Sequence, residues 1–485
     1  MDYEAVIGLE THVQLKTKSK MWCGCANEFG APPNTHVCPV CLGLPGVLPV
    51  ANEEALRLTA LTGLLLNCTV SRHAKFDRKN YFYPDMPKNY QITQYDKPST
   101  VAGWVEFEFR GDLARVRITR AHLEEDVGKN FHFERQSGVD FNRAGVPLME
   151  IVSEPDLTSA EMAYEYLNAL KDILIYGGVS DCDMEKGMVR CDVNVSVRPR
   201  GQQELGAKIE IKNMNSFSGV RKALEYEIPR QIEVLKGGGK LIQSTRRWDD
   251  VAGMTEEMRT KEHAHDYRYF PEPDLMPFQP SDAWLAEVKS RVVELPLARK
   301  QRFMRDYQLP ASDAQTFVWD KDLGNYFEEE VSKIPADVQW ERRTKKVKAI
   351  ANYLINNVRA ERAKQAEMGE VRPYPARGLI LDVTNMVENG TANSATAQLC
   401  ISEIVRTDTP AAVTIREKGL AQVTDAAAIE ALCDEAIAAN PGPAADYKAG
   451  KLAALNRLTG HVMKLSKGKA NPALVREILE RKLKG

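Results

Sequence analysis

The sequence lacks the features that would assign it to several common classes of protein. Its 485 residues contain no run of the roughly 18 apolar residues that a membrane-spanning helix needs. The opening MDYEAVIGLETHV is acidic and has no apolar stretch of the kind found in a secretory signal. A formal net charge of −2 gives the chain as a whole no attraction to nucleic acid, so any basic surface must be local. We therefore expect a cytoplasmic protein with no membrane contact.

Several catalytic motifs are missing as well. The sequence contains no G-x-x-x-x-G-K-[ST] phosphate-binding loop, no G-x-S-x-G nucleophile elbow and no protein-kinase signature set. The pair Gly239-Lys240 lacks both the upstream glycine and the following hydroxyl of a phosphate-binding loop. A nucleophilic triad therefore has little support, and the chemistry must be sought among carboxylates, histidine and lysine.

The pattern of apolar residues divides the chain into three parts. A hydrophobic share of 43% and a charged share of 27% are typical of globular proteins, and 485 residues exceed what one hydrophobic core serves. Strand-like alternation dominates residues 1–294, helical spacing dominates residues 295–406, and a helical tail rich in Ala and Leu occupies residues 407–485. The predicted fold class is α+β.

The last part of the tail is locally basic. Between Asp446 and Gly485, ten Lys and Arg residues stand against three Asp and Glu residues. Such a helical surface suits contact with a phosphate backbone, but a solvated helix face explains the same composition equally well. The salt dependence of nucleic-acid binding distinguishes the two interpretations.

Three segments combine an apolar row with a polar row. VRCDVNVSVR, residues 189–198, alternates strictly for ten positions, and residues 3–13 and the segment AKIEIKN alternate in the same way. Successive side chains of a strand point to opposite faces, so each segment predicts one polar face. A half-exposed strand gives such a face without any function, but Asp and Asn are poor strand formers, which favours a functional reason. The polar rows include Glu10 and His12, then Asp192 and Asn194, then Lys208, Glu210 and Lys212.

Further acidic residues favour a metal site. The segment HLEEDVGKN brings Glu124, Glu125 and Asp126 together, and adjacent acids imply a metal ion or a paired basic residue. Oxygen ligands with one imidazole are typical of magnesium sites that also hold phosphates, whose charge lysines neutralise. The candidate ligands are Glu10, His12, Glu125, Glu150, Asp192, Asn194 and Glu210, and the candidate phosphate partners are Lys79, Lys88 and Lys208.

The cysteines suggest a second metal. Nine cysteines, an odd number, argue against a complete disulfide framework. Cys23-x-Cys25 and Cys38-x-x-Cys41 are separated by twelve residues, a spacing that lets four thiolates surround one zinc ion. Four sulfur ligands leave no open position, so the zinc would be structural. The alternative of two redox dithiols is weaker, because no thioredoxin-like strand and helix surround either pair.

Long motifs follow one another along the whole chain. They are IGLETHVQL, CPVCLGLPGVLPV, KNYFYPDMPKNYQITQ, RAHLEEDVGK, DFNRAGVPLMEIVSEPD, VRCDVNVSVRP, EIKNMNSF, HDYRYFPEPDL and, in the tail, GKLAALNRLTGHVMKLSKGKANP. Together they resemble the B subunits of the aspartyl/glutamyl-tRNA amidotransferases, the GatB family. The resemblance runs from the first predicted strand into the tail.

The resemblance implies both an architecture and a reaction. It implies an antiparallel-sheet cradle with a four-cysteine zinc loop at residues 1–294, a helical domain at 295–406 and a basic, YqeY-like tail domain at 407–485. The B subunit would use ATP and Mg²⁺ to phosphorylate the side-chain carboxylate of Glu on tRNA(Gln) or of Asp on tRNA(Asn). Ammonia, made from glutamine by the amidase or A subunit, would then displace phosphate, and the small C subunit would tie the heterotrimer together.

The family also implies roles for particular residues. The metal and activation site would comprise Glu10, His12, Glu125, Glu150 and Asp192, of which the first four would bind magnesium. The residues that face the nucleotide or acyl group would be Lys79, Lys88, Asn194, Lys208 and Glu210. A four-cysteine site occurs in only some members, which supports a structural zinc at Cys23, Cys25, Cys38 and Cys41.

Two other functions remain open at this point. The first is a non-catalytic tRNA-binding scaffold, in which the polar rows are only solvated and a partner performs the phosphorylation. The second is a stand-alone metal hydrolase, which would turn over without partners, tRNA or ATP. The sequence also leaves open whether the Gln route, the Asn route or both operate.

Overall fold

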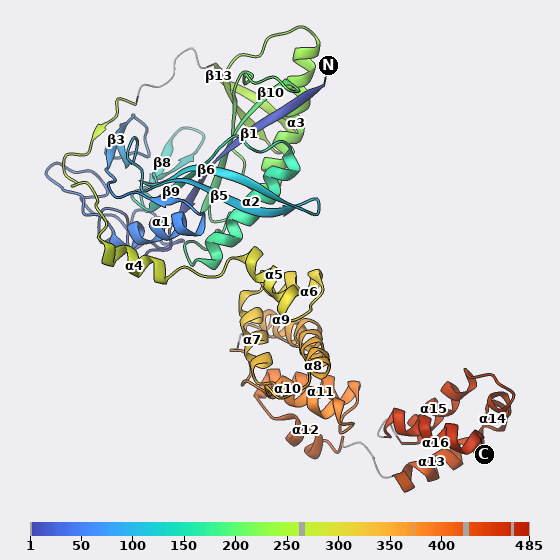
Figure 1. The fold of residues 1–485 in the computed structure, drawn as a ribbon. Helices are drawn as coiled ribbons and strands as arrows, with labels where there is room; N and C mark the ends of the chain where they lie inside the picture. The colour runs from blue at the N-terminus through green and yellow to red at the C-terminus, as the bar shows by residue number, and fades with distance from the viewer. Residues whose placement is uncertain (1, 261–266, 371, 421–425, 467–469, 485) are drawn as a thin grey trace. The chain divides into compact units, whose positions relative to one another are not determined.

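A computed structural model describes residues 2–260, 267–370, 372–420, 426–466 and 470–484. The chain forms two compact units, Met1–Ala298 and Arg299–Gly485, which run from blue to yellow and from yellow to red in Figure 1. The first two residues of the motif HDYRYFPEPDL, and residues 467–469 of the tail motif, lie outside the described residues.

A nine-stranded sheet organises the first unit, in the order β13-β12-β11-β10-β1-β9-β6-β5-β2. Its neighbouring strands pair antiparallel, apart from β11 and β12, which run parallel. Helix α3 (Phe217–Lys236) lies between these two in sequence and supplies the crossover that parallel neighbours require. The strands are β1 (Tyr3–Gln14), β2 (Thr69–Val70), β5 (Thr100–Phe109), β6 (Asp112–Glu125), β9 (Pro147–Ser153), β10 (Val189–Pro199), β11 (Ile209–Lys212), β12 (Ser244–Asp249) and β13 (Met254–Thr260).

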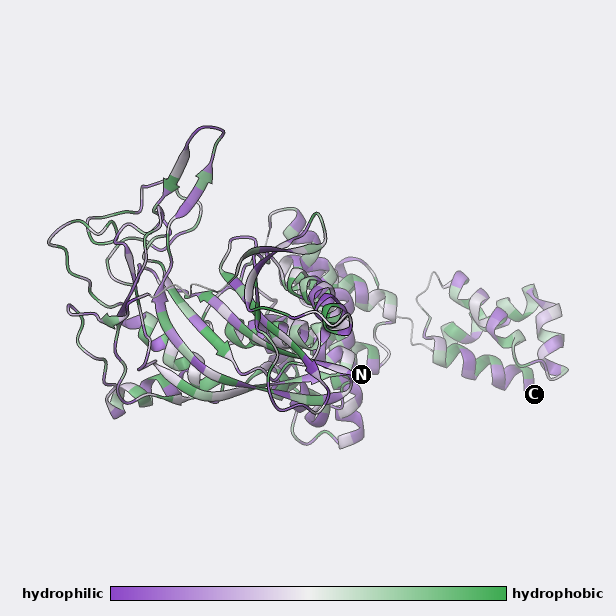
Figure 2. Cartoon of the chain, turned by 90° about the horizontal axis from the view of Figure 1, so that it is seen from above, coloured by the Kyte–Doolittle hydropathy of each residue, from purple (hydrophilic) through white to green (hydrophobic). Residues whose placement is uncertain are grey.

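The apolar row of each predicted strand forms the core of this unit. Ile7 and Leu9 of β1 and Val193 and Val195 of β10 are buried in one cluster. Helices α1 (Glu53–Leu65), α2 (Ala160–Tyr176) and α3 contribute to this cluster, and α1 contacts β6, α2 contacts β5 and α3 contacts β10. Figure 2 shows hydrophobic and hydrophilic residues alternating along the strands. The α+β fold class is confirmed, and the polar rows are left on the face that the helices do not cover.

Two small sheets and one helix complete the unit. β3 (Asp77–Asn80), β4 (Tyr90–Thr93) and β14 (Phe270–Pro271) form a three-stranded sheet, and β7 (Lys129–His132) pairs with β8 (Ser137–Asp140). The short strands β3 and β4 lie on either side of Pro84 and Pro87, which exclude regular structure between them. Helix α4 (Asp282–Ser290) follows near the end of the unit.

Helices form the second unit around two hydrophobic cores. One core contains residues between Phe303 and Ile415, and the other contains residues between Ile429 and Leu483. Helix α12, which the sequence analysis grouped with the tail, packs into the first core. The helices are α5 (Pro296–Asp306), α6 (Ala311–Trp319), α7 (Lys321–Ser332), α8 (Trp340–Tyr353), η1 (Leu354–Val358), α9 (Arg359–Glu367), α10 (Leu379–Glu388), α11 (Ser394–Thr407), α12 (Ala411–Glu417), α13 (Ala426–Ala439), α14 (Pro441–Lys448), α15 (Ala454–Leu465) and α16 (Pro472–Lys484).

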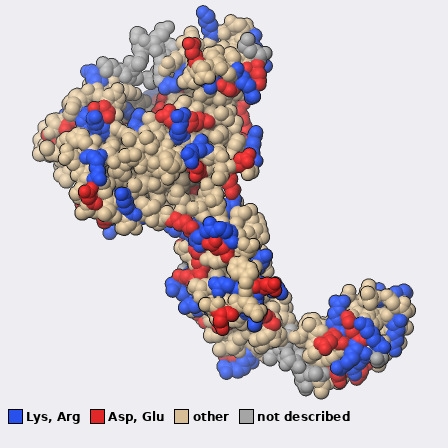
Figure 3. Space-filling view, in the orientation of Figure 1, with Lys and Arg blue, Asp and Glu red and all other residues tan. Residues whose placement is uncertain are grey.

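Charge is unevenly distributed over the surface. Figure 3 shows many Lys and Arg side chains on the helices that follow residue 426, interspersed with acidic ones. Within the part of the chain that the structure describes, we find no helix with the length and apolar character to cross a membrane.

Candidate functional site

Three strands bring polar side chains together on the face of the sheet that the helices do not cover. In the strand register, His12 of β1 pairs with Glu150 of β9, and Glu150 pairs with His122 of β6. His12 Nε2 lies 3.4 Å from Glu150 Oε2, and His122 Nε2 lies 3.7 Å from the same oxygen. Glu124 follows His122 by two residues and so points to the same face, with Oε1 3.7 Å from His12 Nε2. Strand register therefore builds a cluster of two imidazoles and two carboxylates.

Part of this cluster has the composition of a divalent-cation site. One ligand atom each from His12, Glu124 and Glu150 lies within 4.8 Å of the others. Glu124 Oε2 is buried and accepts no hydrogen bond among the described residues, so it is an acceptor in need of a partner. Two carboxylates suit Mg²⁺, which is usually bound by one or two carboxylates and keeps waters and substrate oxygens in its shell. These residues fit the magnesium that the family resemblance implies.

The environment sets the protonation of the cluster. Burial alone would lower the pKa of His12, but its hydrogen bond with Glu150 and the nearby carboxylates raise it overall. Burial lowers the pKa of His122 to about 4. Burial would raise the pKa of Glu150, but the two histidines lower it overall, whereas the pKa of Glu124 is raised by burial against the charge of Lys79. At neutral pH the cluster therefore contains an ionised Glu150 and a neutral His122.

Glu125, predicted from the sequence as a magnesium ligand, lies apart from this cluster. Its buried carboxylate forms an ion pair with Lys88 and accepts a hydrogen bond of 2.9 Å from the backbone N–H of Ile92. The amide of Gln91 donates to the backbone oxygen of Glu125 over 2.7 Å. Adjacent residues of a strand point to opposite faces, so only one of Glu124 and Glu125 reaches His12. The structure brings Glu124 there and pairs Lys88 with Glu125.

The polar face continues onto β10 and β11. Glu10 pairs with Asp192 in the strand register, and Asn194 Nδ2 donates to Glu10 Oε1 over 2.8 Å. Lys212 forms an ion pair with Asp192 and another, of 3.1 Å, with Glu210. Burial would lower the pKa of Lys212, but these two carboxylates raise it overall. A lysine held charged by two acids thus lies on the same face as the His12 cluster.

Two further lysines lie at the borders of this face. Lys79 of β3 places Nζ 4.0 Å from Glu124 Oε2, and although burial opposes its charge, Glu124 raises its pKa overall. Lys208 lines a pocket of about 210 Å³ together with Glu10 and Asn194. The Oδ1 atom of Asn194 is buried and accepts no hydrogen bond among the described residues. Around this face the structure gathers Glu10, His12, Lys79, Glu150, Asp192, Asn194, Lys208 and Glu210 of the predicted site residues.

Three contributors were not among the predicted site residues: His122, Glu124 as a ligand, and Lys212. The signal for the first two was the spacing of two residues in RAHLEED, which places them on one strand face. Lys212 follows Glu210 by the same spacing. What the sequence could not supply was the pairing of β6 with β9, which decides whether the row containing Glu124 or the row containing Glu125 meets Glu150.

The four cysteines of the paired motifs converge on one point. The sulfur atoms of Cys23, Cys25, Cys38 and Cys41 lie within 4.8 Å of one another. The backbone N–H of Cys38 donates to Cys41 Sγ over 3.2 Å, and Nζ of the buried Lys20 lies 3.7 Å from the same sulfur. Contact with the Cys23 thiol, helped by this N–H and the Lys20 charge, lowers the pKa of Cys41 to about 4. Clustered sulfurs with N–H donors around them fit a closed, structural zinc site.

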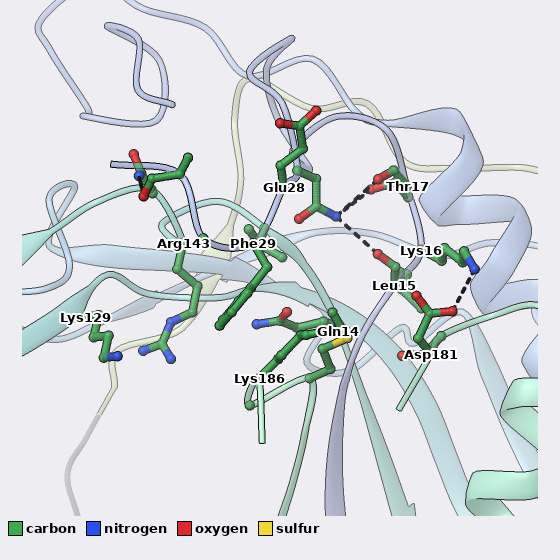
Figure 4. A pocket seen from close by; sticks show the side chains of 18 of the residues that line it. Gln14, Leu15, Lys16, Thr17, Glu28, Phe29, Lys129, Arg143, Asp181 and Lys186 are labelled. Carbon is green, nitrogen blue, oxygen red and sulfur yellow. Dashed lines mark hydrogen bonds and ion pairs between the residues drawn. The ribbon is translucent and has the colours of Figure 1, made fainter. Parts of the chain in front are cut away.

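A larger cavity opens beyond the end of β1. Its volume is about 420 Å³, and its lining includes Gln14, Phe29, Lys129, Arg143 and Lys186 (Figure 4). Gln14 Nε2 donates to Asp126 over 2.9 Å, which ties this end of β1 to the end of β6. None of the predicted metal or phosphate residues lines this cavity, so the candidate site is the polar face of the sheet.

Comparison with known proteins matches the part of the chain that contains this face to a catalytic domain. Residues 5–286 match the GatB/GatE catalytic domain, and residues 339–483 match the GatB domain. The chain belongs to the GatB family. A relative from Methylacidiphilum infernorum, named as the B subunit of aspartyl/glutamyl-tRNA(Asn/Gln) amidotransferase, is 51% identical over 100% of this chain and 99% of its own. Proteins of the same name from Carboxydothermus hydrogenoformans and Caldicellulosiruptor saccharolyticus are 49% and 47% identical, over 99% and 100% of this chain and 99% of each relative.

The match to the catalytic domain covers every site described above. The range 5–286 includes the polar face, the four clustered cysteines and the 420 Å³ cavity. The family resemblance predicted from the sequence motifs is confirmed over the full length.

Proposed function

We propose that this GatB-family chain is the activating component of a tRNA-dependent amidotransferase. It phosphorylates the side-chain carboxylate of Glu on tRNA(Gln), or of Asp on tRNA(Asn), with ATP, and ammonia then converts the activated carboxyl into the amide. The names of full-length relatives support the reaction class. The observation that carries the catalytic role is the cluster of His12, Glu124 and Glu150 beside Lys79, on a face shared with Asp192 and Lys212.

The metal would be held by the imidazole of His12 and the carboxylates of Glu124 and Glu150. Magnesium bound there supplies charge neutralisation for the transferring phosphoryl group. His12 would bind the ion as a neutral imidazole, and the carboxylates that raise its pKa would be the other ligands. His122 stays neutral at physiological pH, so it adds no positive charge that would repel the metal.

The lysines of the face serve the phosphoryl transfer directly. A carboxylate oxygen of the aminoacyl side chain attacks the γ-phosphorus of ATP, the bond to the β,γ-bridging oxygen breaks, and ADP leaves. Lys79 and Lys212 are positioned to neutralise the anionic oxygens, because Glu124 and Asp192 hold their ammonium groups at the face. Glu10 and Asn194 form a hydrogen-bonded pair next to Lys208, which suits them to orient the nucleotide.

Partners and the remaining parts of the chain complete the proposal. The ammonia comes from the A subunit, which is an amidase, and the small C subunit completes the heterotrimer, as the family resemblance implies. The cysteine cluster would hold a structural zinc. We assign the catalytic cradle to residues 1–294, a helical connecting domain to residues from 295 to the end of α12 at Glu417, and a tRNA-contacting tail domain to the helices from α13 onward.

Acyl-phosphate formation by the assembled complex tests the catalytic assignment. With ATP labelled in the γ-phosphate and misacylated tRNA, His12→Ala or Asp192→Ala should abolish label transfer to the aminoacyl group. The glutaminase activity of the amidase partner should survive both changes. Glu106→Gln, which removes one partner of the exposed pair with Arg115, is the matched control and should transfer label normally.

The results separate the proposal from its alternatives. Normal label transfer by both variants would reduce this chain to a tRNA-binding scaffold. Turnover of an ester or phosphate substrate by the isolated chain, with neither ATP nor tRNA, would instead indicate a metal hydrolase.

A further inference from the structure

Four tyrosines form a continuous aromatic wall beside the cluster of His12, Glu124 and Glu150. Tyr95 and Tyr269 stack with ring centroids 4.2 Å apart and planes 9° from parallel. Tyr267 contacts Tyr269 edge-on at 6.1 Å, and Tyr81 contacts Tyr267 in the same manner at 6.1 Å. The aromatic wall comprises Tyr81, Tyr95, Tyr267 and Tyr269. Its rings come from two segments far apart in sequence, with Tyr81 and Tyr95 in one and Tyr267 and Tyr269 in the other.

The inner end of the aromatic wall reaches the reaction centre. Lys79 Nζ lies 5.3 Å from the ring centroid of Tyr267 and 4.0 Å from Glu124 Oε2. Burial, against the charge of Lys79 and with the charges of Glu124 and Glu150, raises the pKa of Tyr269 to about 12. One lysine therefore links the wall to a proposed metal ligand.

The outer end of the aromatic wall is open. Tyr95 is 59% exposed, although one of its faces is covered by Tyr269. Two exposed cationic residues lie close to these rings in sequence. Lys97 follows Tyr95 by two residues, and Arg268 stands between Tyr267 and Tyr269. A stack that ends on an exposed ring leaves a π-face for one more planar group.

Hydrogen bonds fix the aromatic wall in place. The backbone N–H of Asn80 donates to the carbonyl of Tyr267 over 2.9 Å, and its side-chain amide donates to the carbonyl of Arg268 over 2.8 Å. The backbone N–H of Tyr95 donates over 3.1 Å to Asp77, whose side chain is buried. The small sheet that carries Lys79 thus positions the rings as well.

We propose that the exposed ring of the aromatic wall stacks one base of the unpaired 3′ end of tRNA and so delivers the aminoacyl group to the cluster of His12, Glu124 and Glu150. Single-stranded nucleic acid is bound by aromatic platforms flanked by basic residues, because every base has a π-face and every nucleotide carries a phosphate. The wall runs from an exposed ring to the phosphoryl-transfer site, which is the path that a polymer with a reactive end requires. This inference rests on the proposed function, since it takes aminoacyl-tRNA as the substrate.

The adenine of ATP could also supply a base for stacking. The pocket next to Lys208 favours a nucleotide site on the other side of the cluster from the wall. Lys79 and the wall approach the cluster at Glu124 on β6. The 210 Å³ pocket lined by Glu10, Asn194 and Lys208 lies on the side of β10 and β11. Nucleotide and tRNA would then approach the cluster of His12, Glu124 and Glu150 from two directions, as in-line transfer between two substrates requires.

A double-mutant cycle between ring and base tests the proposal. The affinity of the assembled complex is measured, without ATP, for tRNAs that carry an abasic residue at one of the last three positions. For wild type, loss of the stacked base should weaken binding roughly tenfold. Tyr95→Ala should weaken binding of intact tRNA to a similar extent and show no further loss with that abasic tRNA. Tyr95→Phe, which keeps the ring, should bind like wild type.

Phe29→Ala is the matched control, because Phe29 is 68% exposed and lies on the segment between the two cysteine pairs. Any change in tRNA affinity caused by Phe29→Ala should be additive with the change caused by each abasic residue. Additive losses for Tyr95→Ala at all three positions would overturn the inference, as would a raised KM for ATP with unchanged tRNA affinity. Failure of Tyr95→Ala to join the heterotrimer would mark the wall as a protein interface instead. Because the readout is binding without ATP, failure of the proposed phosphoryl transfer leaves this result unaffected.

Discussion

The carboxylates of Glu124 and Glu125 are adjacent in sequence and lie in opposite environments. Glu124 Oε1 lies 3.7 Å from His12 Nε2, whereas Glu125 Oε1 accepts a hydrogen bond of 2.9 Å from Ile92 and its other oxygen pairs with Lys88. Both side chains are buried. One acid therefore belongs to the cluster with His12 and Glu150, and the other neutralises a buried lysine.

Replacing Glu124 should weaken magnesium binding and leave the stability of the fold nearly unchanged. Glu124→Gln removes one negative charge from the proposed ligand set, so we expect magnesium to bind at least about tenfold more weakly, since each 1.4 kcal/mol of lost interaction is tenfold in affinity. The thermal midpoint of the metal-free protein should change little. The Mg²⁺ concentration that gives half-maximal phosphoryl transfer measures the effect, and an unchanged concentration would remove Glu124 from the ligand set.

Replacing Glu125 should have the reverse outcome. Glu125→Gln leaves the ammonium of Lys88 buried without its counter-charge, and breaking a buried pair in this way costs about 3–5 kcal/mol of unfolding free energy. Chemical denaturation measures this loss. The double variant Lys88→Met with Glu125→Met should recover much of it, because two apolar side chains leave no buried charge. A double variant as unstable as Glu125→Gln would contradict this explanation.

The contrast between these two acids shows how far sequence reasoning reaches. Strict alternation in VRCDVNVSVR predicted the polar row of β10 correctly, and strand alternation alone places His12 with Glu10. Alternation also states that Glu124 and Glu125 face opposite sides, but not which side meets Glu150. That choice depends on the register of β6 against β9, a long-range pairing with no local signal. The stacking of Tyr95 on Tyr269 has no local signal either, since the two rings meet only after folding.

A buried glutamate on α3 should make stability depend on acid pH. Glu227 accepts hydrogen bonds of 2.6 Å from Arg230 and 2.7 Å from the Thr255 hydroxyl, which joins α3 to β13. Burial would raise the pKa of Glu227, but these donors lower it overall. A lowered pKa in the folded state means that the carboxylate stabilises the protein above its unfolded pKa of about 4.3 and that this contribution is lost as pH falls through the folded pKa.

The variant Glu227→Gln reports this contribution. Its unfolding free energy should fall below that of wild type by about 1–3 kcal/mol at pH 7, because a charged hydrogen-bond acceptor is lost. The difference should shrink below about pH 4, where the wild-type carboxyl begins to take up a proton. Denaturant titrations at several pH values measure it, and a difference independent of pH would show that Glu227 does not act through its charge.

Removal of the cysteine cluster should release zinc and loosen the neighbouring ion pair. We expect about one zinc per chain by metal analysis, lost in a variant with Cys38→Ser and Cys41→Ser. Gly43 lies so close to Lys88 that a Cβ on it would be 2.6 Å from Lys88 Cγ, so displacement of this loop exposes the Lys88–Glu125 pair and should lower the thermal midpoint. Cys433→Ala, at an isolated cysteine of the tail core, should keep its zinc.

The basic tail should contact tRNA through charge alone, and the structure shows how to test this without unfolding it. Deleting everything after Asp446 would remove Leu455, Leu458 and Val475 from the tail core, so loss of binding would not be specific. Lys448, Arg457 and Lys464 are exposed, and substituting glutamine for all three leaves that core intact. If each contacts one phosphate, the slope of log affinity against log salt should become shallower by about 3, because each lost contact removes about one released counterion.

Glu403→Gln, at an acidic residue of α11 outside the tail core, controls for unrelated changes in charge. A triple variant with the wild-type slope would show that these three side chains are only solvated, and the tail would then need another role in the complex.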